Sequence, residues 1–471
     1  MLYVIGLIPI TIVIVIIFAI HQYSEFKFRK TDETMKWAIS IPGVPFLGNV
    51  MEFHGTTDTL NDMTRLHDKY GKSVYLWGPT GRMFISADYD FIEFALSTSL
   101  ILNKSDEYSF LQRWLGFGLL TSERTKWRKM RKLLTPAFHF SILQQFIDSF
   151  EANGVKLVEK LKKMDGKDID IYRYITLYSL DVICGSSMGV AINAQEIEDS
   201  EYVKNVKLLC KIVAQRQNRV QERLSIFYWM FPNYWKERNA VRKIHNFTYS
   251  VIDSRRKLLN ETSTTEEDGE NCETKKRVAF LDMLLQSTID GRPLTDDEIR
   301  QEVDTFMFEG HDTTGSAMSF ALFLLANHPD IQEKALEEQK SIFAGNILRQ
   351  ATYDDLQNMK YLECVIKETL RLYPSVPFFA RKTDKDVEYK GNIIPAGLNI
   401  GIFAYGMMRS SEFYPDPTTF NPSRFEDNDG KKPYSYIAFS AGPRNCIDCS
   451  HPYRGVSFLW SSGEKMFVNS A

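Results

Sequence analysis

A single cysteine, Cys446, ends a short stretch whose residue types could hold a metal ion. The stretch Phe439–Cys446 contains Gly442 and Pro443 side by side, a pair that favours a loop. A thiolate is a strong anionic metal ligand where nearby positive charge lowers its pKa. Arg444, two residues earlier, can supply that charge or bind a carboxylate through two N–H groups. A structural cysteine in a surface turn is the alternative that composition alone leaves open.

A second set of candidate residues interrupts a long apolar segment. These residues, which stand close together, are Glu309, Gly310, Asp312 and Thr313. Gly in a helix interior costs about 1 kcal/mol relative to Ala, and charged residues are poor choices beside apolar ones. Local rules broken in the middle of an element often mark a functional site. The alternative is a solvated polar face, which fits badly because most surrounding residues are apolar. The residues at 309 and 313 are four apart and would share one side of a helix.

The helix that must carry this group has a clear beginning and end. Thr295 and Glu298 form the pattern of a capping box, and His328-Pro329 is a stop signal. Apolar periodicity between them predicts one helix to about Asn327, which is roughly 48 Å long at 1.5 Å per residue. Such a helix would cross the whole domain and present its polar middle in the interior.

Two further pairs stand at helical spacing. Trp127 and Arg131 are four apart in a basic segment, and a solvated basic face with one buried Trp is the alternative reading. Glu368 and Arg371 are three apart, and most such pairs are exposed and contribute only about 0.2–0.5 kcal/mol. Neither pair points to a function by itself.

The order Phe-x-x-Gly-x-Arg-x-Cys over 439–446 resembles the haem-binding loop of the cytochrome P-450 superfamily of haem-thiolate monooxygenases. The resemblance implies that Cys446 is the proximal iron ligand, which favours O–O cleavage. It also implies a set of residues around the haem. Phe439 and Gly442 belong to the loop, and the residues expected to hold the haem propionates are Trp127, Arg131, Arg381 and Arg444.

The polar group of the long helix is similar to the family's oxygen-activation motif. The resemblance implies that Gly310 gives room for dioxygen, while Asp312 and Thr313 form an acid–alcohol pair that delivers protons. Glu309 stands at the usual Ala position, which resembles the fatty-acid omega-hydroxylase branch, family four. In that branch this carboxylate can esterify a haem methyl. The family's Glu-x-x-Arg pair is buried and structural, and here it would comprise Glu368, Arg371 and, from a later loop, Arg424.

The resemblance implies a mainly α fold with small β-sheets, and the runs 73–77 and 83–86 predict a β-hairpin. Residues 1–21 are uncharged through Ile20 and are long enough for a transmembrane signal anchor, with a cleaved signal peptide as the alternative. Basic residues 27–36 and a Pro/Gly hinge make up residues 22–50. The haem-thiolate domain is then expected over 51–446, on the cytosolic face of the endoplasmic reticulum membrane.

Bulk composition limits the partners. The 471 residues carry a net charge of −3, which gives no sign of a nucleic-acid partner. The resemblance implies haem, a lipophilic substrate and membrane lipid. It also implies electrons from an NADPH-dependent reductase, or a cytochrome b-type donor. The donor would dock on the basic proximal face formed by Arg128, Lys129 and Lys132.

The segment after the cysteine departs from the family pattern. The family continues as Cys-x-Gly into a proximal helix and a hairpin, but Asp448 replaces the Gly, and residues 447–471 contain no amphipathic helix. We therefore expect a C-terminus that is truncated, alternatively spliced or wrongly assigned. Two alternatives to a monooxygenase remain: an inactive member unable to hold haem, and a haem-thiolate isomerase or dehydratase.

Overall fold

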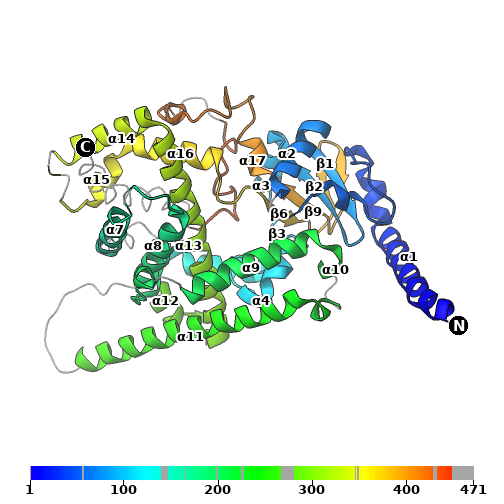
Figure 1. Ribbon diagram of the computed structural model, residues 1–471, viewed down its shortest axis with the longest axis horizontal. Helices are drawn as coiled ribbons and strands as arrows, with labels where there is room; N and C mark the ends of the chain where they lie inside the picture. The colour runs from blue at the N-terminus through cyan, green and yellow to red at the C-terminus, as the bar shows by residue number, and fades with distance from the viewer. Residues whose placement is uncertain are drawn as a thin grey trace.

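The computed structural model describes residues 2–55, 58–138, 147–164, 166–197, 200–223, 227–266, 280–344, 346, 349–427 and 432–447. Most of them are helical, and the strands form one small sheet and two hairpins, which confirms the mainly α prediction. Figure 1 shows the sheet with α1, α2, α3 and α17 on one side of the molecule and α7, α8, α13 and α14 on the other.

The helices are α1 (Leu2–Thr34), α2 (Thr59–Tyr70), α3 (Tyr89–Ser97), α4 (Gln112–Leu115), α5 (Arg124–Leu134), α7 (Ile147–Lys162), α8 (Ile171–Ile183), α9 (Glu201–Asn218), α10 (Val220–Arg223), α11 (Pro232–Glu266), α12 (Phe280–Gln286), α13 (Asp296–Asn327), α14 (Pro329–Ile342), α15 (Tyr353–Asn358), α16 (Lys360–Leu372) and α17 (Ala404–Met407). The strands are β1 (Ser73–Gly78), β2 (Gly81–Ser86), β3 (Asn103–Lys104), β4 (Thr288–Ile289), β5 (Arg292–Pro293), β6 (Phe379–Lys382), β7 (Val387–Tyr389), β8 (Asn392–Ile394) and β9 (Asn399–Ile402).

The main sheet joins parts of the chain that are far apart in sequence, in the order β1-β2-β9-β6-β3. Its first two strands form the antiparallel hairpin that the sequence predicts. Strand β2 pairs with β9 in parallel, and β6 pairs with β9 and β3 in antiparallel register. In the last pairing Lys104 lies opposite Arg381, so the edge of the sheet brings two cations together.

Helix α13 is the central element, and it begins with the predicted capping box of Thr295 and Glu298. Its first half packs in one apolar cluster through Val303 and Met307, and its second half packs in another through Met318. The polar segment 309–316 therefore lies between two cores, and α13 crosses α8 there (Figure 1).

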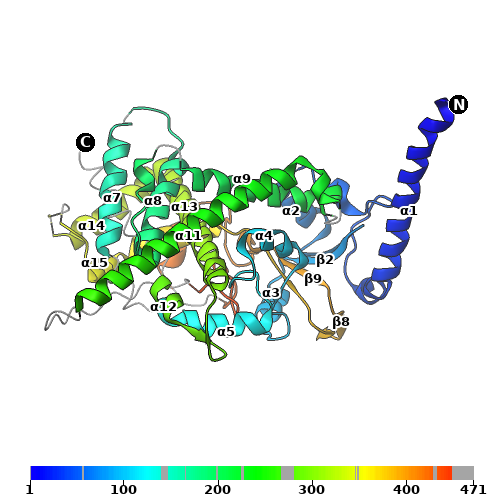
Figure 2. The same ribbon diagram turned by 90° about the horizontal axis from the view of Figure 1, so that it is seen from below.

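Helix α1 projects from the sheet side of the molecule in both views (Figure 2). Its C-terminal half is attached to the hairpin by Asp32, which accepts hydrogen bonds from Arg82 Nε at 2.8 Å and Nη2 at 2.9 Å and from Tyr75 Oη at 2.6 Å. Within the residues that the structure describes, none of the helices combines the length and the apolar character needed to cross a membrane.

The predicted departure of the C-terminus concerns Asp448 and the residues after it. These lie outside the described residues, so the expected loss of the proximal helix stays a prediction.

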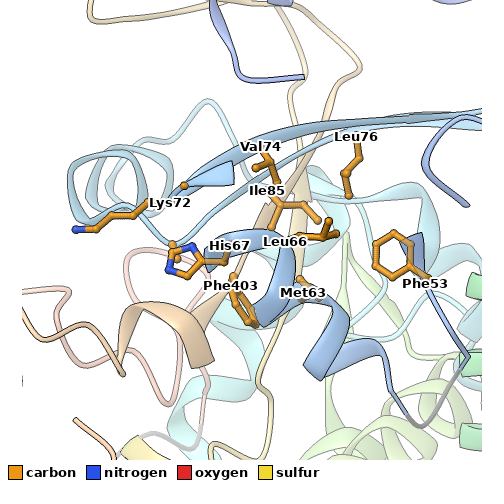
Figure 3. A pocket seen from close by; sticks show the side chains of 11 residues that line it. Phe53, Met63, Leu66, His67, Lys72, Val74, Leu76, Ile85 and Phe403 are labelled. Atoms are coloured by element: carbon orange, nitrogen blue, oxygen red, sulfur yellow. The ribbon is translucent and has the colours of Figure 1, made fainter. Parts of the chain in front are cut away.

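A small apolar cavity lies between α2 and the hairpin (Figure 3). Met63 and Leu66 line it from the helix, Ile85 from β2, and Phe403 closes the other side. None of the predicted site residues lines this cavity, so it belongs to the packing of the sheet and not to the candidate site.

Candidate active site

The predicted metal-binding loop is tightly closed on itself. Cys446 N–H donates to the carbonyl of Phe439 at 3.0 Å, and Asn445 N–H donates to that of Gly442 at 3.1 Å. Gly442 has a φ of +71°, and a Cβ there would lie 1.8 Å from the carbonyl oxygen of Leu96. The glycine is thus required by contact with the end of α3, a reason that the sequence pattern of the loop did not indicate. Cys446 itself is exposed.

Arg444 lies in the interior and ties the loop to distant backbone. Its Nη1 donates to the carbonyl of Leu102, and its Nη2 donates to that of Ser122 at 2.6 Å. The guanidinium lies 5.1 Å from the ring centre of Trp127, the buried aromatic residue of α5. Burial, followed by repulsion from Arg381, lowers the pKa of Arg444 to about 9. Its Nε has no hydrogen-bond partner among the described residues.

The sheet edge supplies two further cations. Arg381 is 3 % exposed and donates from Nη2 to the carbonyl of Arg444 at 3.3 Å. Lys104, its partner across the β3–β6 pair, lies with its ammonium 4.3 Å from the ring centre of Tyr108. Sequence reasoning missed Lys104, because it belongs to no motif and gains its position only from pairing with a strand some 280 residues later.

The effects of these charged groups on one another's pKa values show which of them lie close enough to interact. Burial lowers the pKa of Lys104, Arg381 and Arg444 lower it further, and Glu309 and Cys446 raise it. Burial raises the pKa of Glu309 to about 7, while Lys104 and Arg444 oppose that rise. Two other cations, one carboxyl group and one thiol are therefore within electrostatic reach of Lys104, although the sequence spaces these groups from 104 to 446.

This charge set fits a haem. Lys104, Arg381 and Arg444 repel one another, and a ligand with two carboxylates would relieve that repulsion. The unpartnered Nε of Arg444 is a donor without an acceptor, as expected beside an anionic group that the protein itself does not supply. A polar cavity of about 480 Å³ adjoins the cluster, and Lys104, Tyr108 and Ser122 line it.

Arg131 lies at the loop rather than in the cluster of cations. Its Nη1 donates to the carbonyl of Asn445 at 2.7 Å, and its Nη2 donates to Oδ1 of Asn445 at 3.0 Å and to the carbonyl of Cys446 at 3.4 Å. In this conformation it holds the cysteine loop against α5. Its expected contact with a propionate stays a prediction.

The basic face expected to receive an electron donor also comes from α5. Arg128, Lys129 and Lys132 are all exposed, and Lys129 forms an ion pair of 2.7 Å with Asp290. The basic surface is therefore exposed in the described structure, and the charge of Lys129 is paired with Asp290.

The polar middle of α13 divides between two sides of the helix. Thr313 Oγ1 donates to the carbonyl of Glu309 at 2.6 Å, one turn earlier. Asp312 instead turns toward α8, where Tyr172 Oη donates to its Oδ1 at 2.8 Å. The structure thus brings Thr313 and Glu309 together, and it gives Asp312 a partner that the sequence did not indicate.

A close contact between two helices, which the sequence did not suggest, explains why position 310 is a glycine. A Cβ at this position would lie 2.7 Å from Cδ1 and 2.9 Å from Cγ1 of Ile183, at the crossing of α13 and α8. The absent side chain permits close packing of two helices. The expectation that Gly310 makes room for dioxygen remains a prediction.

Gly310→Ala is expected to destabilise the protein by about 1 kcal/mol, because overpacking costs about 1–3 kcal/mol and the better helix propensity of Ala returns about 1. In an Ile183→Ala background, which removes both Cδ1 and Cγ1, the same change should be neutral or stabilising. Urea unfolding of the four proteins measures this. Equal effects of Gly310→Ala in both backgrounds would contradict the contact.

The predicted structural trio is present and buried. Glu368 and Arg371 are completely buried and bonded twice, by Nε at 2.6 Å and Nη2 at 2.8 Å. Arg424 completes the group at 3.4 Å from Glu368. Arg371 also donates to the carbonyls of Met408 at 3.0 Å and Pro417 at 2.8 Å. The group therefore fixes α16 to the segment that leads to the cysteine loop.

Two other buried carboxyl groups of α13 have raised pKa values. Burial raises the pKa of Glu302 to about 8 and that of Asp304 to about 7. Glu302 accepts a hydrogen bond from Leu119 N–H at 2.9 Å, and Thr248 Oγ1 donates to Asp304. These groups hold protons in the folded state that they lose in the unfolded state above about pH 4.5, so their contribution to stability is lost as pH rises to about 8.

Glu302→Gln should remove much of this pH dependence, because Gln keeps an acceptor for Leu119 and cannot ionise. The parent should lose on the order of 4 kcal/mol from Glu302 between pH 4.5 and 8. Urea midpoints at pH 5 and pH 8 measure the difference. Glu298→Gln is the control, since the pKa of Glu298 is lowered to about 2, mainly by Arg292, and its effect should be equal at both pH values. An unchanged slope in Glu302→Gln would contradict the assignment.

Comparison with known proteins gives consistent matches. The family model described as Cytochrome P450 matches residues 40–447. Cytochrome P450 4d10 of Drosophila mettleri is 41% identical over 436 residues, covering 89% of this chain and 83% of that protein. Cytochrome P450 4V2 of Homo sapiens is 44% identical over 362 residues, covering 76% of this chain and 69% of that protein.

Proposed function

This chain belongs to the cytochrome P450 family, and from that premise we propose that it inserts one oxygen atom of O2 into a long-chain fatty acid or a related lipid, at the terminal carbon. The class of enzyme, a cytochrome P450 monooxygenase, follows from the family itself. The lipid substrate is supported by similarity to members of family four and by Glu309 at the position that marks the omega-hydroxylase branch.

The observation that carries the proposal is the convergence of Cys446 and Glu309 with three buried or half-buried cations. Cys446 would ligate the haem iron, while Lys104, Arg381 and Arg444 would bind the propionates beside Trp127. The haem, when bound, supplies the reductive activation of O2. Asp312 and Thr313 would deliver protons. An NADPH-dependent reductase would supply electrons across the face that carries Arg128 and Lys132.

Glu309 supports a further part of the proposal, a covalent bond to the haem. Its carboxyl group and Cys446 both act on the pKa of Lys104, and Lys104 and Arg444 favour the carboxylate form of Glu309. Turnover with NADPH and O2 would supply the oxidation of a haem methyl that an ester requires. Extraction with acidic organic solvent after turnover tests it, because the haem should stay with the parent chain and leave Glu309→Ala.

A membrane location is proposed from two parts of the surface. The first twenty residues contain no charged side chain, and the segment from η8 (Tyr228–Met230) into α11 exposes large apolar residues. Trp229 is 56 % exposed, Met230 63 % and Trp235 55 %. Amphipathic aromatic rings favour the interface of a bilayer. We propose that the chain is anchored in the endoplasmic reticulum membrane with its haem domain in the cytosol.

The first experiment is an absorption spectrum of the purified chain, reduced and exposed to carbon monoxide. A strongly red-shifted Soret band is expected, and its absence would contradict haem-thiolate ligation and favour an inactive family member. Where the band is present, incubation with reductase, NADPH and fatty acids of graded length should give terminal hydroxylation by mass spectrometry. Rearrangement or dehydration of lipid peroxides without NADPH would instead favour an isomerase or dehydratase.

A further inference from the structure

A row of hydroxyl groups follows the crossing of α8 and α13. Thr176 and Ser179 come from α8 and lie against Gly315 of α13, where a Cβ would be in ordinary contact with Ser179 Oγ at 3.4 Å and with Thr176 Oγ1 at 3.6 Å. Ser179 Oγ donates to the carbonyl of His311 at 2.8 Å. This interface is polar although apolar clusters lie on both sides of it. Burying hydroxyl groups costs free energy that an apolar interface between the two helices would not cost.

Tyr172 lies at the outer end of this row and contacts Asp312. Its hydroxyl donates to Asp312 Oδ1 at 2.8 Å, and both side chains are half-buried. Burial and the Asp312 carboxylate raise the pKa of Tyr172, whereas Ser316 and Thr176 lower it, so all three hydroxyl groups are neighbours. Within the described residues, Asp312 Oδ2 accepts no hydrogen bond, and this oxygen remains available for proton exchange.

A third helix joins at the same point. Lys207 of α9 is exposed, and its ammonium lies 4.8 Å from the ring centre of Tyr172. Its charge also reaches His311: burial lowers the pKa of His311, the hydrogen bond to Met307 and the charge of Asp312 oppose this, and Lys207 adds a smaller lowering. The junction of α8, α9 and α13 thus runs from a solvated cation, across an aromatic hydroxyl, to the carboxylate beside Thr313.

We propose that Tyr172 is the positioning residue of the proton supply: its hydroxyl holds Asp312 at this junction, where Oδ2 exchanges protons with solvent beside Lys207. The inference rests on the proposed monooxygenase function. One turnover joins one oxygen atom of O2 to the substrate and releases the other as water, which consumes two electrons from NADPH and two protons. A carboxylate that is not held in place would supply those protons more slowly, and reduced oxygen would leave as hydrogen peroxide.

The first test concerns the contact and needs no haem. Tyr172→Phe should lower the melting temperature by about 2 °C, because a hydrogen bond to a charged group is lost in a large chain. In an Asp312→Ala background the same change should lower it by at most half as much. Tyr174→Phe, on the same helix two residues later, is the matched control and should behave alike in both backgrounds. Equal losses for Tyr172→Phe in both would overturn the proposal.

The second test concerns the role, in the haem-loaded chain with its reductase. Tyr172→Phe should keep the carbon monoxide spectrum and the KM for substrate, lower kcat about tenfold, and raise hydrogen peroxide released per NADPH consumed. Its solvent deuterium isotope effect on kcat should rise, since proton supply becomes limiting. Tyr174→Phe should match the parent in every measurement.

The outcomes separate this inference from the proposed function. A parent chain without the thiolate-haem band would overturn both, because there would be no oxygen chemistry to supply with protons. A parent with the band, together with a Tyr172→Phe variant of unchanged peroxide yield and isotope effect, would overturn the inference alone. A fall in kcat without a change in either quantity would assign Tyr172 a purely structural role and would also overturn it.

Discussion

Cys446→Ala is expected to abolish the red-shifted Soret band of the reduced, carbon monoxide-treated protein completely. The loop offers one thiolate, and no other described cysteine lies near the cations that surround it: Cys184 and Cys364 are buried elsewhere. Because Cys446 is exposed, its truncation leaves no cavity, and the fold should be retained. The far-ultraviolet circular dichroism of the variant should therefore match that of the parent.

The matched control for this prediction is Cys210→Ala, which removes a half-buried thiol on α9 and should leave the band in place. A band that survives in Cys446→Ala would show that another residue ligates the iron. A band lost in both variants would mean that general destabilisation, rather than loss of the ligand, explains the result.

Arg371→Met is expected to destabilise the protein by about 3–5 kcal/mol, the second large effect. It leaves the completely buried carboxylate of Glu368 with the N–H of Asn421 at 3.0 Å and, as its one remaining cation, the poorly aligned Arg424 at 3.4 Å. It also leaves the carbonyls of Met408 and Pro417 without their donor. Urea unfolding and the soluble yield of the chain measure the loss.

Glu363→Gln is the control on the same helix, since it breaks a partly exposed pair of 2.7 Å with Lys367 and should cost at most about 0.5 kcal/mol. Adding Glu368→Leu to Arg371→Met should recover part of the loss, because a buried ion pair replaced as a unit leaves no uncompensated carboxylate. A loss in Arg371→Met no larger than that of the control would contradict a structural role for the pair.

Local sequence rules predicted the elements that local interactions determine. The capping box at Thr295 predicted the beginning of α13, and the short apolar runs 73–77 and 83–86, separated by a turn, predicted the β1–β2 hairpin. The buried pair of Glu368 and Arg371 was also predicted, but only through family resemblance, since spacing alone favours an exposed pair. Burial is a tertiary property, and a short motif does not encode it.

What the sequence did not predict depends on contacts between distant segments. Lys104 joins the site because β3 pairs with β6, and Tyr172 meets Asp312 because α8 crosses α13 at Gly310 and Gly315. The two glycines Gly310 and Gly442 were assigned to ligands, whereas their nearest neighbours are protein atoms. A glycine signals that something approaches closely, but its sequence context does not identify what approaches.

The attachment of α1 determines how a force on the N-terminus reaches the haem domain. Asp32 receives two N–H groups from Arg82, a side chain that is 2 % exposed, and one hydroxyl from Tyr75. These three hydrogen bonds join a continuous helix to a sheet, so this connection resists bending more than a flexible linker would. With the proposed anchor, the tilt of α1 in the bilayer sets the angle of the sheet, and of the haem domain that contains it, relative to the lipid surface. Loosening this joint should then alter access for membrane-dissolved substrates while leaving water-soluble ones unaffected.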